Sequence, residues 1–429
     1  MVQEKAVISK VAWRFIPLLI TCAFLAYLDR VNVSFAAITM NADIGLSAAA
    51  YGFGAGVFFL SYVLFEVPSN IILEKVGARR WLARIMVTWG IISLCMVFVR
   101  GEYSFYILRG LLGIAEAGLY PGIVYFLSTW FPAEYRGRIG SLFWLSIPLS
   151  TVIGAPISGL ILGLDGVWGL QGWMWLFILE SLPTIFMAFV LLRVLTDRPA
   201  EADWLERDER EWLVERMASE QAAASQESPH SALAAITDSR VLAMGLVCFG
   251  AVIINYGVSF FLPTIIKGFG LSNTAVGVVS ALPYVAALGG IMTFGYISDK
   301  TGSRFGCTAV AILLVAACLV LSTFFDGLVL KMAALTAAGF FMFGYLPAFW
   351  AIPQQFLRGA ALASGIAAIN AIANVAGFVG PYLMGYLRDT TGSFEAGLRT
   401  LAAVGALFVL WLLAVRRGTQ RQLRSAPAR

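Results

Sequence analysis

Long apolar runs separated by short polar segments dominate the chain. A helix that crosses a bilayer needs about 20 mostly apolar residues, and windows of that length find twelve candidate spans. Their approximate extents are residues 13–40, 50–73, 81–99, 104–128, 139–163, 173–195, 240–266, 274–297, 306–325, 330–352, 361–385 and 397–415. The pattern predicts an all-α membrane protein with twelve transmembrane helices, six on each side of one long polar insert.

Composition supports lipid as the solvent for most of the chain. Of 429 residues, 59% are hydrophobic and 13% are charged, and the mean hydropathy is +0.82. An ordinary soluble domain carries about 25% charged residues, so disorder and nucleic-acid binding are both poor explanations. The five cysteines are scattered through apolar stretches and follow no disulfide or metal-ligand spacing. The one histidine, His230, lies in a polar segment, so we expect no metal, no cofactor and no imidazole chemistry.

The polar insert divides the chain into predicted parts. These are an N-terminal six-helix bundle, a cytoplasmic central loop, a C-terminal six-helix bundle and a basic cytoplasmic tail, at residues 1–195, 196–239, 240–415 and 416–429. The insert holds eleven acidic residues and four arginines. Apolar residues recur in it at helical spacing, at Trp204, Leu205, Trp212 and Leu213. This spacing indicates an amphipathic helix that lies on the membrane or on the bundle, followed by a flexible linker at about 222–231.

The distribution of positive charge predicts the orientation. Of the 30 Lys and Arg residues, 23 lie at the two termini or after even-numbered spans, five follow odd-numbered spans, and Arg30 and Arg109 lie within spans. Positively charged loops stay on the cytoplasmic side, so both termini are expected in the cytoplasm of a multi-pass inner-membrane protein. The net charge of +5 is then a topological signal. The first span is expected to be retained, because it exceeds signal-peptide length and lacks a small-residue cleavage site.

An internal repeat relates the two halves. Asn70-x-x-x-Glu74-Lys75-x-Gly77-x-Arg79, after the second span, recurs 225 residues later as Gly295-x-x-x-Asp299-Lys300-x-Gly302-x-Arg304. The prolines of spans five and eleven, Pro156 and Pro381, keep the same offset. Six plus six helices with termini on one side predict two parallel repeats, related by an axis along the membrane normal.

These segments resemble the signature of the major facilitator superfamily, G-x-x-x-D-R/K-x-G-R/K-R/K after spans two and eight. The second copy fits well, whereas the first has Asn70 for glycine and Glu74 for aspartate. Further segments resemble the anion:cation symporter branch: Tyr27-Leu-Asp29-Arg30-Val-Asn32, Arg109 to Gly118 with Pro121-Gly122, and Phe131-Pro-Ala-Glu-Tyr-Arg136-Gly137-Arg138. Residues 65–70, Phe-Glu-Val-Pro-Ser-Asn, are similar to the tartrate-type permeases. The resemblance implies the major facilitator fold and a transporter, not an enzyme.

Few ionisable residues lie deep in the spans. Each one costs at least about 2.5 to 3.5 kcal/mol there unless it has a partner or a wet cavity. The six are Asp29, Arg30, Glu66, Arg109, Glu116 and Glu180, all in the first half. Four of them, Asp29, Arg30, Arg109 and Glu116, correspond at the repeat offset to Ile254, Asn255, Ala334 and Phe341. We therefore expect proton and anion chemistry in the N-terminal bundle, and shape and neutral contacts from the other.

Buried carboxyls and arginines together suggest a coupling mechanism. Low dielectric favours a protonated carboxyl, whereas a neighbouring arginine favours the carboxylate. If a substrate anion competes for Arg30 or Arg109, the released Asp29 or Glu116 takes up a proton. The resemblance implies that Asp29 and Glu116 carry protons, Arg30 contacts the substrate carboxylate and Arg109 partners the acids. The alternative is that these pairs only join helices, and the roles of Glu66 and Glu180 stay open.

Neutral and gating candidates complete the predicted site. By resemblance, Tyr27, Tyr62, Trp350 and Asn370 occupy binding-cavity positions, with ordinary interhelical packing as the alternative. The repeated loops supply predicted gating residues at Glu74, Arg79, Asp299 and Arg304. Such loops can join the two bundles when the cytoplasmic side is shut, unless they only anchor the topology.

Together these features predict a monomeric carrier that imports a small organic anion, such as tartrate or a sugar acid, with protons by alternating access. It would need no nucleic-acid partner. One alternative is a proton-driven efflux antiporter of the same fold. A more distant one is a membrane-embedded enzyme or receptor scaffold, for which we find no catalytic motif.

Overall fold

The computed structural model describes residues 4–226, 237–357 and 359–425. Within these ranges the chain is helical, with short connections. The α-helices are α1 (Glu4–Ile44), α2 (Ala48–Val76), α3 (Ala78–Cys95), α4 (Glu102–Glu116), α5 (Leu119–Trp130), α6 (Ala133–Trp144), α7 (Ser146–Ile161), α8 (Gly172–Val194), α9 (Arg207–Gln226), α11 (Ser239–Lys267), α12 (Asn273–Thr301), α13 (Arg304–Ser322), α14 (Leu328–Trp350), α15 (Gly359–Thr391) and α16 (Glu395–Ser425). Short 3-10 helices lie at Met96–Phe98, Leu162–Leu164, Val167–Gly169, Pro199–Glu201 and Pro353–Gln355.

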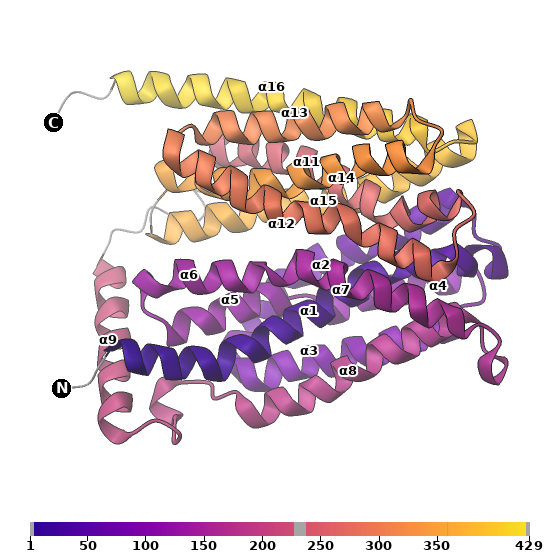
Figure 1. Cartoon of the computed structure of the whole chain (residues 1–429). Helices are drawn as coiled ribbons and strands as arrows, with labels where there is room; N and C mark the ends of the chain where they lie inside the picture. The colour runs from indigo at the N-terminus through magenta and orange to yellow at the C-terminus, as the bar shows by residue number, and fades with distance from the viewer. Residues whose placement is uncertain (1–3, 227–236, 358, 426–429) are drawn as a thin grey trace.

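The helices form two groups. Twelve segments of the described chain are long and apolar enough to cross a membrane. Helices α1 to α8 make up the first half and α11 to α16 the second, drawn in indigo to magenta and in orange to yellow in Figure 1. The predicted all-α fold of two six-helix bundles is confirmed. His230, the second half of the predicted linker and the last four residues of the predicted tail lie outside the described residues.

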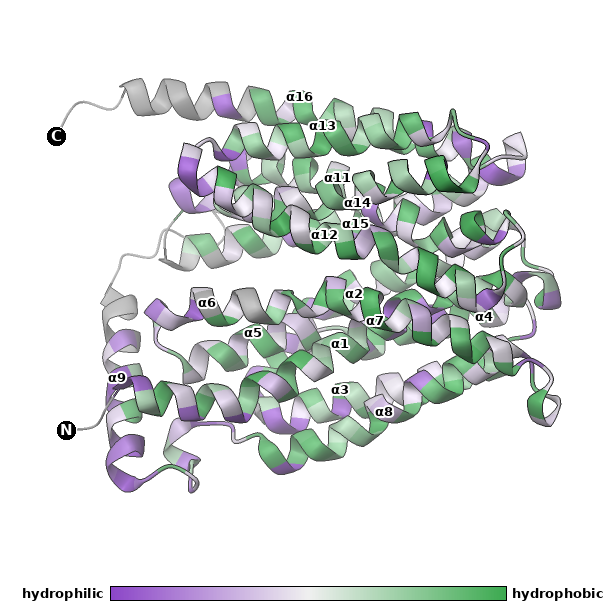
Figure 2. Ribbon diagram, in the orientation of Figure 1, coloured by the Kyte–Doolittle hydropathy of each residue, from purple (hydrophilic) through white to green (hydrophobic). Residues whose placement is uncertain are grey.

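The outer surface of both groups is apolar. Figure 2 shows hydrophobic residues along the transmembrane helices and hydrophilic ones gathered on α9 and at helix ends. Large apolar side chains such as Leu64, Ile107 and Met292 are exposed. A water-soluble monomer rarely exposes so much contiguous apolar surface, so this surface faces lipid.

The two halves meet at one end of the molecule. We call the end where α1 begins and α16 finishes the terminal face, and the opposite end the far face. The halves converge at the far face and diverge toward the terminal face (Figure 1). At the far face, a side chain on Gly52 of α2 would overlap the carbonyl of Pro381 on α15, and Gly159 of α7 lies against Gly277 of α12. Tyr51 donates a hydrogen bond to the carbonyl of Phe260, at 3.1 Å, across the same boundary.

A carboxylate closes this end further. Asp389, near the end of α15, accepts hydrogen bonds from the backbone N–H groups of Ala48 and Ala49 at 3.1 and 2.7 Å. These are orphan donors of the first turn of α2, where a negative charge also meets the positive end of the helix dipole. Asp389 therefore joins the halves across the far face.

Helix α9 lies across the terminal face of the first half, roughly perpendicular to the membrane helices (Figure 1). Trp204, just before it, stacks on Trp130 with ring centroids 5.7 Å apart, and Leu213 within it is fully buried. Lys10 of α1 donates a hydrogen bond to Glu209, which lowers the pKa of that carboxyl. The amphipathic pattern left open whether this helix lies on the membrane or on the bundle. Helix α9 covers the bundle.

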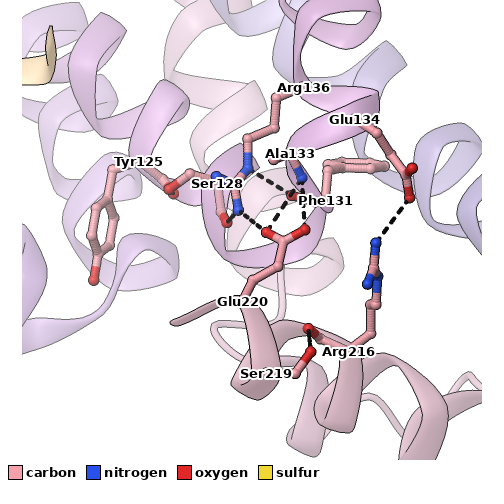
Figure 3. Close-up of polar contacts among 9 residues, drawn as sticks. All are labelled: Tyr125, Ser128, Phe131, Ala133, Glu134, Arg136, Arg216, Ser219 and Glu220. Carbon is pink, nitrogen blue, oxygen red and sulfur yellow. Dashed lines mark hydrogen bonds and ion pairs between the residues drawn. The ribbon is translucent and has the colours of Figure 1, made fainter. Parts of the chain in front are cut away.

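The end of α9 holds the turn between α5 and α6, as Figure 3 shows. The Glu220 carboxylate accepts from the Ala133 backbone N–H at 3.0 Å and from Arg136 Nη2 at 3.1 Å. Arg136 also donates to the carbonyl of Phe131, at 2.7 Å. The segment from Phe131 to Arg136, singled out by its resemblance to a family pattern, is thus a docking site for α9.

Candidate functional site

The fourth predicted span is two helices, not one. Helix α4 ends at Glu116 and α5 begins at Leu119, with Gly118 between them in the left-handed region at φ 92°. A Cβ on Gly118 would lie 2.9 Å from the Cβ of Ser69 on α2, so the close approach also requires glycine. The span predicted at 104–128 is confirmed as Glu102–Trp130, and the structure adds a break inside it that the hydropathy pattern did not show. The break puts the Glu116 carboxyl at a helix end inside the membrane protein.

Glu116 forms an ion pair with Arg30 of α1. Both side chains are buried. Four aromatic rings surround the guanidinium, those of Phe58, Phe59, Tyr62 and Tyr120, with Arg30 Cζ 5.1 to 5.8 Å from their centroids. Arg30 Nη1 also donates to the hydroxyl of Tyr256 in the second half, at 3.5 Å. Arg30 therefore lies where the two halves meet.

The Arg30 cluster keeps unused hydrogen-bonding capacity. Arg30 Nε and Glu116 Oε2 are buried and have no hydrogen-bond partner in the described structure. Guanidinium and carboxylate pair best in bidentate fashion, and this pair uses one contact. A second carboxylate can therefore compete for Arg30 without first breaking a complete fork.

Asp29, the neighbour of Arg30, faces another direction. Its carboxyl accepts hydrogen bonds from Asn32 on α1 and from Trp89 and Ser93 on α3. These three neutral donors hold Asp29 inside the first half. The two predicted proton carriers, Asp29 and Glu116, thus have different surroundings.

Arg109 lies in α4, near Asp29 and Glu116 but hydrogen-bonded to neither. Its Nη2 donates to the carbonyl of Ala55 at 3.3 Å, and its Cζ lies 4.9 Å from the centre of the Phe58 ring. The same ring contacts Arg30. The two arginines therefore share an aromatic ring, and Arg109 lies near Asp29 and Glu116 without a hydrogen bond to either among the described residues.

The neutral candidates divide into two sets. Tyr62 lies against Arg30, with Arg30 Cζ 5.2 Å from its ring centre. Tyr27 is buried, and its hydroxyl has no hydrogen-bond partner within the described ranges. Trp350 and Asn370, on α14 and α15, are half-buried. Within the described residues, neither of these two hydrogen-bonds to Arg30 or lies with a ring against it.

Sequence reasoning missed Tyr120 and Tyr256. Tyr120 lies directly after the helix break and donates to the carbonyl of Ala23 at 3.1 Å. Tyr256 follows Asn255, the repeat counterpart of Arg30. The position of Tyr256 beside this counterpart could have pointed to it, because the two halves present equivalent positions to a common axis.

The two predicted gating arginines, Arg79 and Arg304, make no hydrogen bond to the opposite half among the described residues. The Arg79 backbone N–H donates to Asp197 at 2.8 Å, and its Nε donates to the carbonyl of Leu192 at 2.6 Å. Arg304 donates to the carbonyl of Ala351 at 2.8 Å. Glu74 and Asp299 are exposed. These contacts accompany the divergence of the halves at the terminal face.

The structure also locates Glu66 and Glu180, the two ionisable residues whose roles the sequence left open. Glu66 is half-buried on α2, and its backbone carbonyl accepts from the Asn70 side chain at 2.8 Å. Glu180 is buried on α8, where the Ser158 hydroxyl donates to it at 2.7 Å. Neither contacts the Arg30 and Glu116 pair through a hydrogen bond among the described residues.

Known proteins resemble this chain along most of its length. The sequence profile of the Major Facilitator Superfamily matches residues 19–381. A protein of Agrobacterium vitis named "Putative tartrate transporter" is 46% identical over 414 residues, which cover 96% of this chain and 95% of that protein. The "Quinolone resistance transporter" of Acinetobacter baumannii is 40% identical over 402 residues, covering 94% of this chain and 93% of that protein.

A solved structure agrees in fold. A bacterial homologue of the human lysosomal transporter Spinster superposes with a TM-score of 0.74 at 16% identity, over 94% of this chain and 96% of that chain. The resemblance drawn from the repeated loops and the first and fourth spans is confirmed by the profile and the close relatives. With twelve membrane helices in two related halves and a buried charged site between them, this chain belongs to the Major Facilitator Superfamily and is a multi-pass membrane transporter.

Proposed function

We propose that this transporter imports a small organic anion, a hydroxy-dicarboxylate such as tartrate or a sugar acid, together with protons. The observation that carries the proposal is the buried Arg30–Glu116 pair, which borders the second half through Tyr256. A substrate carboxylate that binds Arg30 displaces Glu116. The released carboxylate then lacks its counter-charge in a low-dielectric site and takes up a proton. The name of the Agrobacterium relative supports tartrate as a first candidate.

The moving bodies in this proposal are residues 1–195 and 240–415, joined by the loop 196–239. The excess of Lys and Arg at the termini and after even-numbered spans supports a cytoplasmic terminal face, with 416–429 as a cytoplasmic tail in the inner membrane. The conformation described above, closed at the far face, then faces inward. When the terminal face closes, Arg79 and Arg304 exchange their present contacts for contacts between the halves, and Glu74 and Asp299 gain such contacts.

Uptake by a monomer reconstituted in proteoliposomes tests the proposal. Labelled tartrate, a hexonate and a hexuronate are offered with and without an inward proton gradient. We expect at least one of the three acids to accumulate only with the gradient. Glu116→Gln, which cannot release or bind a proton, should lose this accumulation and keep counterflow, the gradient-free exchange of internal for external substrate. Accumulation that is equal with and without the gradient would contradict proton coupling.

One observation favours a second candidate function. The Acinetobacter relative is named for quinolone resistance, which is consistent with proton-driven export. Quinolones carry a carboxyl group, so Arg30 has the chemistry to bind them. Counterflow with a labelled fluoroquinolone distinguishes the two: exchange of the quinolone, with none of the three acids, favours export.

A further inference from the structure

Glu180 is a buried carboxyl that the proposed mechanism leaves unused. Its side chain on α8 is 4% exposed. The Ser158 hydroxyl of α7 donates to Oε1 at 2.7 Å, whereas Oε2 is buried and has no hydrogen-bond partner among the described residues. The buried ion pair of the described membrane region, Arg30 with Glu116, does not involve it. Among the described residues, Glu180 thus lies in a membrane protein interior with the Ser158 hydroxyl as a donor and no paired cation.

Asn32 connects Glu180 to Asp29. The Asn32 side chain is 1% exposed, and its Nδ2 donates to Asp29 Oδ1 at 3.0 Å. The same amide group faces Glu180. Its oxygen, Oδ1, is buried and accepts no hydrogen bond from the part of the chain that the structure describes. The Asn32 side chain therefore acts on two carboxyls, those of Asp29 and Glu180.

The carboxyls of Asp29 and Glu180 differ in the hydrogen-bond donors that surround them. Asp29 accepts from three donors, which suits a carboxylate. Glu180 has the Ser158 hydroxyl and a share of the Asn32 amide, and a buried carboxylate with so little compensation is unfavourable. A proton on Glu180 would turn its carboxyl into a donor as well as an acceptor and would remove repulsion between the two acids.

The helices packed against Glu180 supply no other charge. From α1 it is faced by Asp29 and Asn32, and from α7 by Ser158. Helix α3, which packs along α8, directs Trp89 and Ser93 to Asp29. Within the described residues, Asp29 is therefore the charged group that acts on Glu180. Any proton held by Glu180 is coupled first to Asp29.

We propose that Glu180 is a third proton-binding residue of this transporter, which holds a proton in this conformation and shares it with Asp29 across Asn32. The step moves one proton from the Glu180 carboxylic acid to the Asp29 carboxylate and leaves a Glu180 carboxylate. Glu180 lies about 12 Å along α8 from its far-face end, whereas Asp29 lies about 22 Å along α1 from its own. Glu180 is thus the acid nearer the far face. This inference rests on the proposed proton-coupled function.

Infrared difference spectroscopy tests the protonation without any substrate. The full chain, reconstituted in lipid, is compared between about pH 5 and pH 8 as wild type and as Glu180→Gln. We expect a protonated-carboxyl band in the wild type that is missing in Glu180→Gln. Thr184→Val, which removes a buried hydroxyl one turn along α8, should keep it. A Glu180→Gln spectrum equal to that of the wild type would overturn the inference.

Two further variants test the assignment and the sharing. Ser158→Ala removes the hydroxyl that donates to Glu180, so it should shift the frequency of the band even where Glu180→Gln folds poorly; an unmoved band belongs to another acid and refutes the assignment. Asp29→Asn removes the opposing negative charge, so the band should titrate about one pH unit lower or more. An unchanged titration would refute the sharing between the two acids.

Failure of this inference can be told from failure of the proposed function. If the wild type accumulates substrate without regard to the proton gradient while the Glu180 band is present, the proposed function fails and Glu180 still binds a proton. If accumulation follows the gradient and the band is absent, Glu180 is a structural acid and this inference fails.

Discussion

Arg30 is held in place by far more than its ion pair with Glu116. Four aromatic rings border the guanidinium, and a tyrosine hydroxyl from the other half accepts from it. A planar fork can stack on rings and donate in two directions at once, which a lysine ammonium cannot do. The surroundings of Arg30 therefore select guanidinium geometry as well as positive charge.

This geometry makes Arg30→Lys a demanding test. Lysine keeps the charge but cannot stack on the rings and reach both Glu116 and Tyr256, so we expect the initial rate of carboxylate uptake to fall about tenfold or more. Arg84→Lys is the matched control, because Arg84 lies over a single ring, that of Trp81, at 3.8 Å and away from Glu116. Uptake by Arg30→Lys at the rate of Arg84→Lys would show that charge alone suffices.

Single residues were predictable to the extent that their chemistry is rare in a membrane. Charge inside a span is costly, so the sequence alone pointed to Arg30, Asp29 and Glu116. Tyr120 and Tyr256 escaped because tyrosines are common in such spans. Their contacts with Arg30 also join residues up to 226 positions apart, a separation that a periodic pattern cannot bridge. The Trp89 and Ser93 partners of Asp29 escaped for the same reason.

At the scale of helices, hydropathy located the spans but not their interruptions. A window of about 20 residues averages over a conformational change at one residue, so the break at Gly118 left no trace in it. The nearby Pro121 and Gly122 were the available signal. The amphipathic pattern before the linker indicated that α9 has one apolar face, but only the packing of Trp204 on Trp130 tells which surface covers it.

The break between α4 and α5 yields a matched pair of variants. Gly118 and Gly270 both have positive φ, at 92° and 79°, so alanine strains both backbones by about 1 to 2 kcal/mol. A Cβ at Gly118 also meets Ser69, whereas nothing lies within 4 Å of one at Gly270. We expect Gly118→Ala to lower the melting temperature more than Gly270→Ala and to reduce uptake, because it displaces Glu116. Equal effects in both assays would mean that the break does not position the acid.

On the scale of the whole molecule, the repeat predicted two related bundles but not how they tilt. A twofold pattern in the sequence is compatible with closure at either face. The face at which the halves close is set by contacts that the repeat does not copy. Asp389 lies across from the start of α2, whereas its counterpart at the repeat offset is Leu164. The far face is thus closed by a charge that belongs to one half alone.

Asp389 should therefore set the balance between the two conformations. Asp389→Ala removes two hydrogen bonds and a favourable charge at a helix start, worth about 1 to 2 kcal/mol together. Such a change shifts a two-state population about fivefold to thirtyfold, here toward opening at the far face.

Spin labels on cysteines introduced at Val167 and Asp326, with the five native cysteines replaced, should report longer distances in Asp389→Ala. Asp389→Asn, which keeps one oxygen acceptor, should lie between it and the wild type. Thr390→Ala removes only hydrogen bonds within α15, those to the carbonyls of Tyr386 and Leu387, and should leave the distances unchanged. An Asp389→Ala distribution equal to that control would mean that close helix packing alone holds the far face shut.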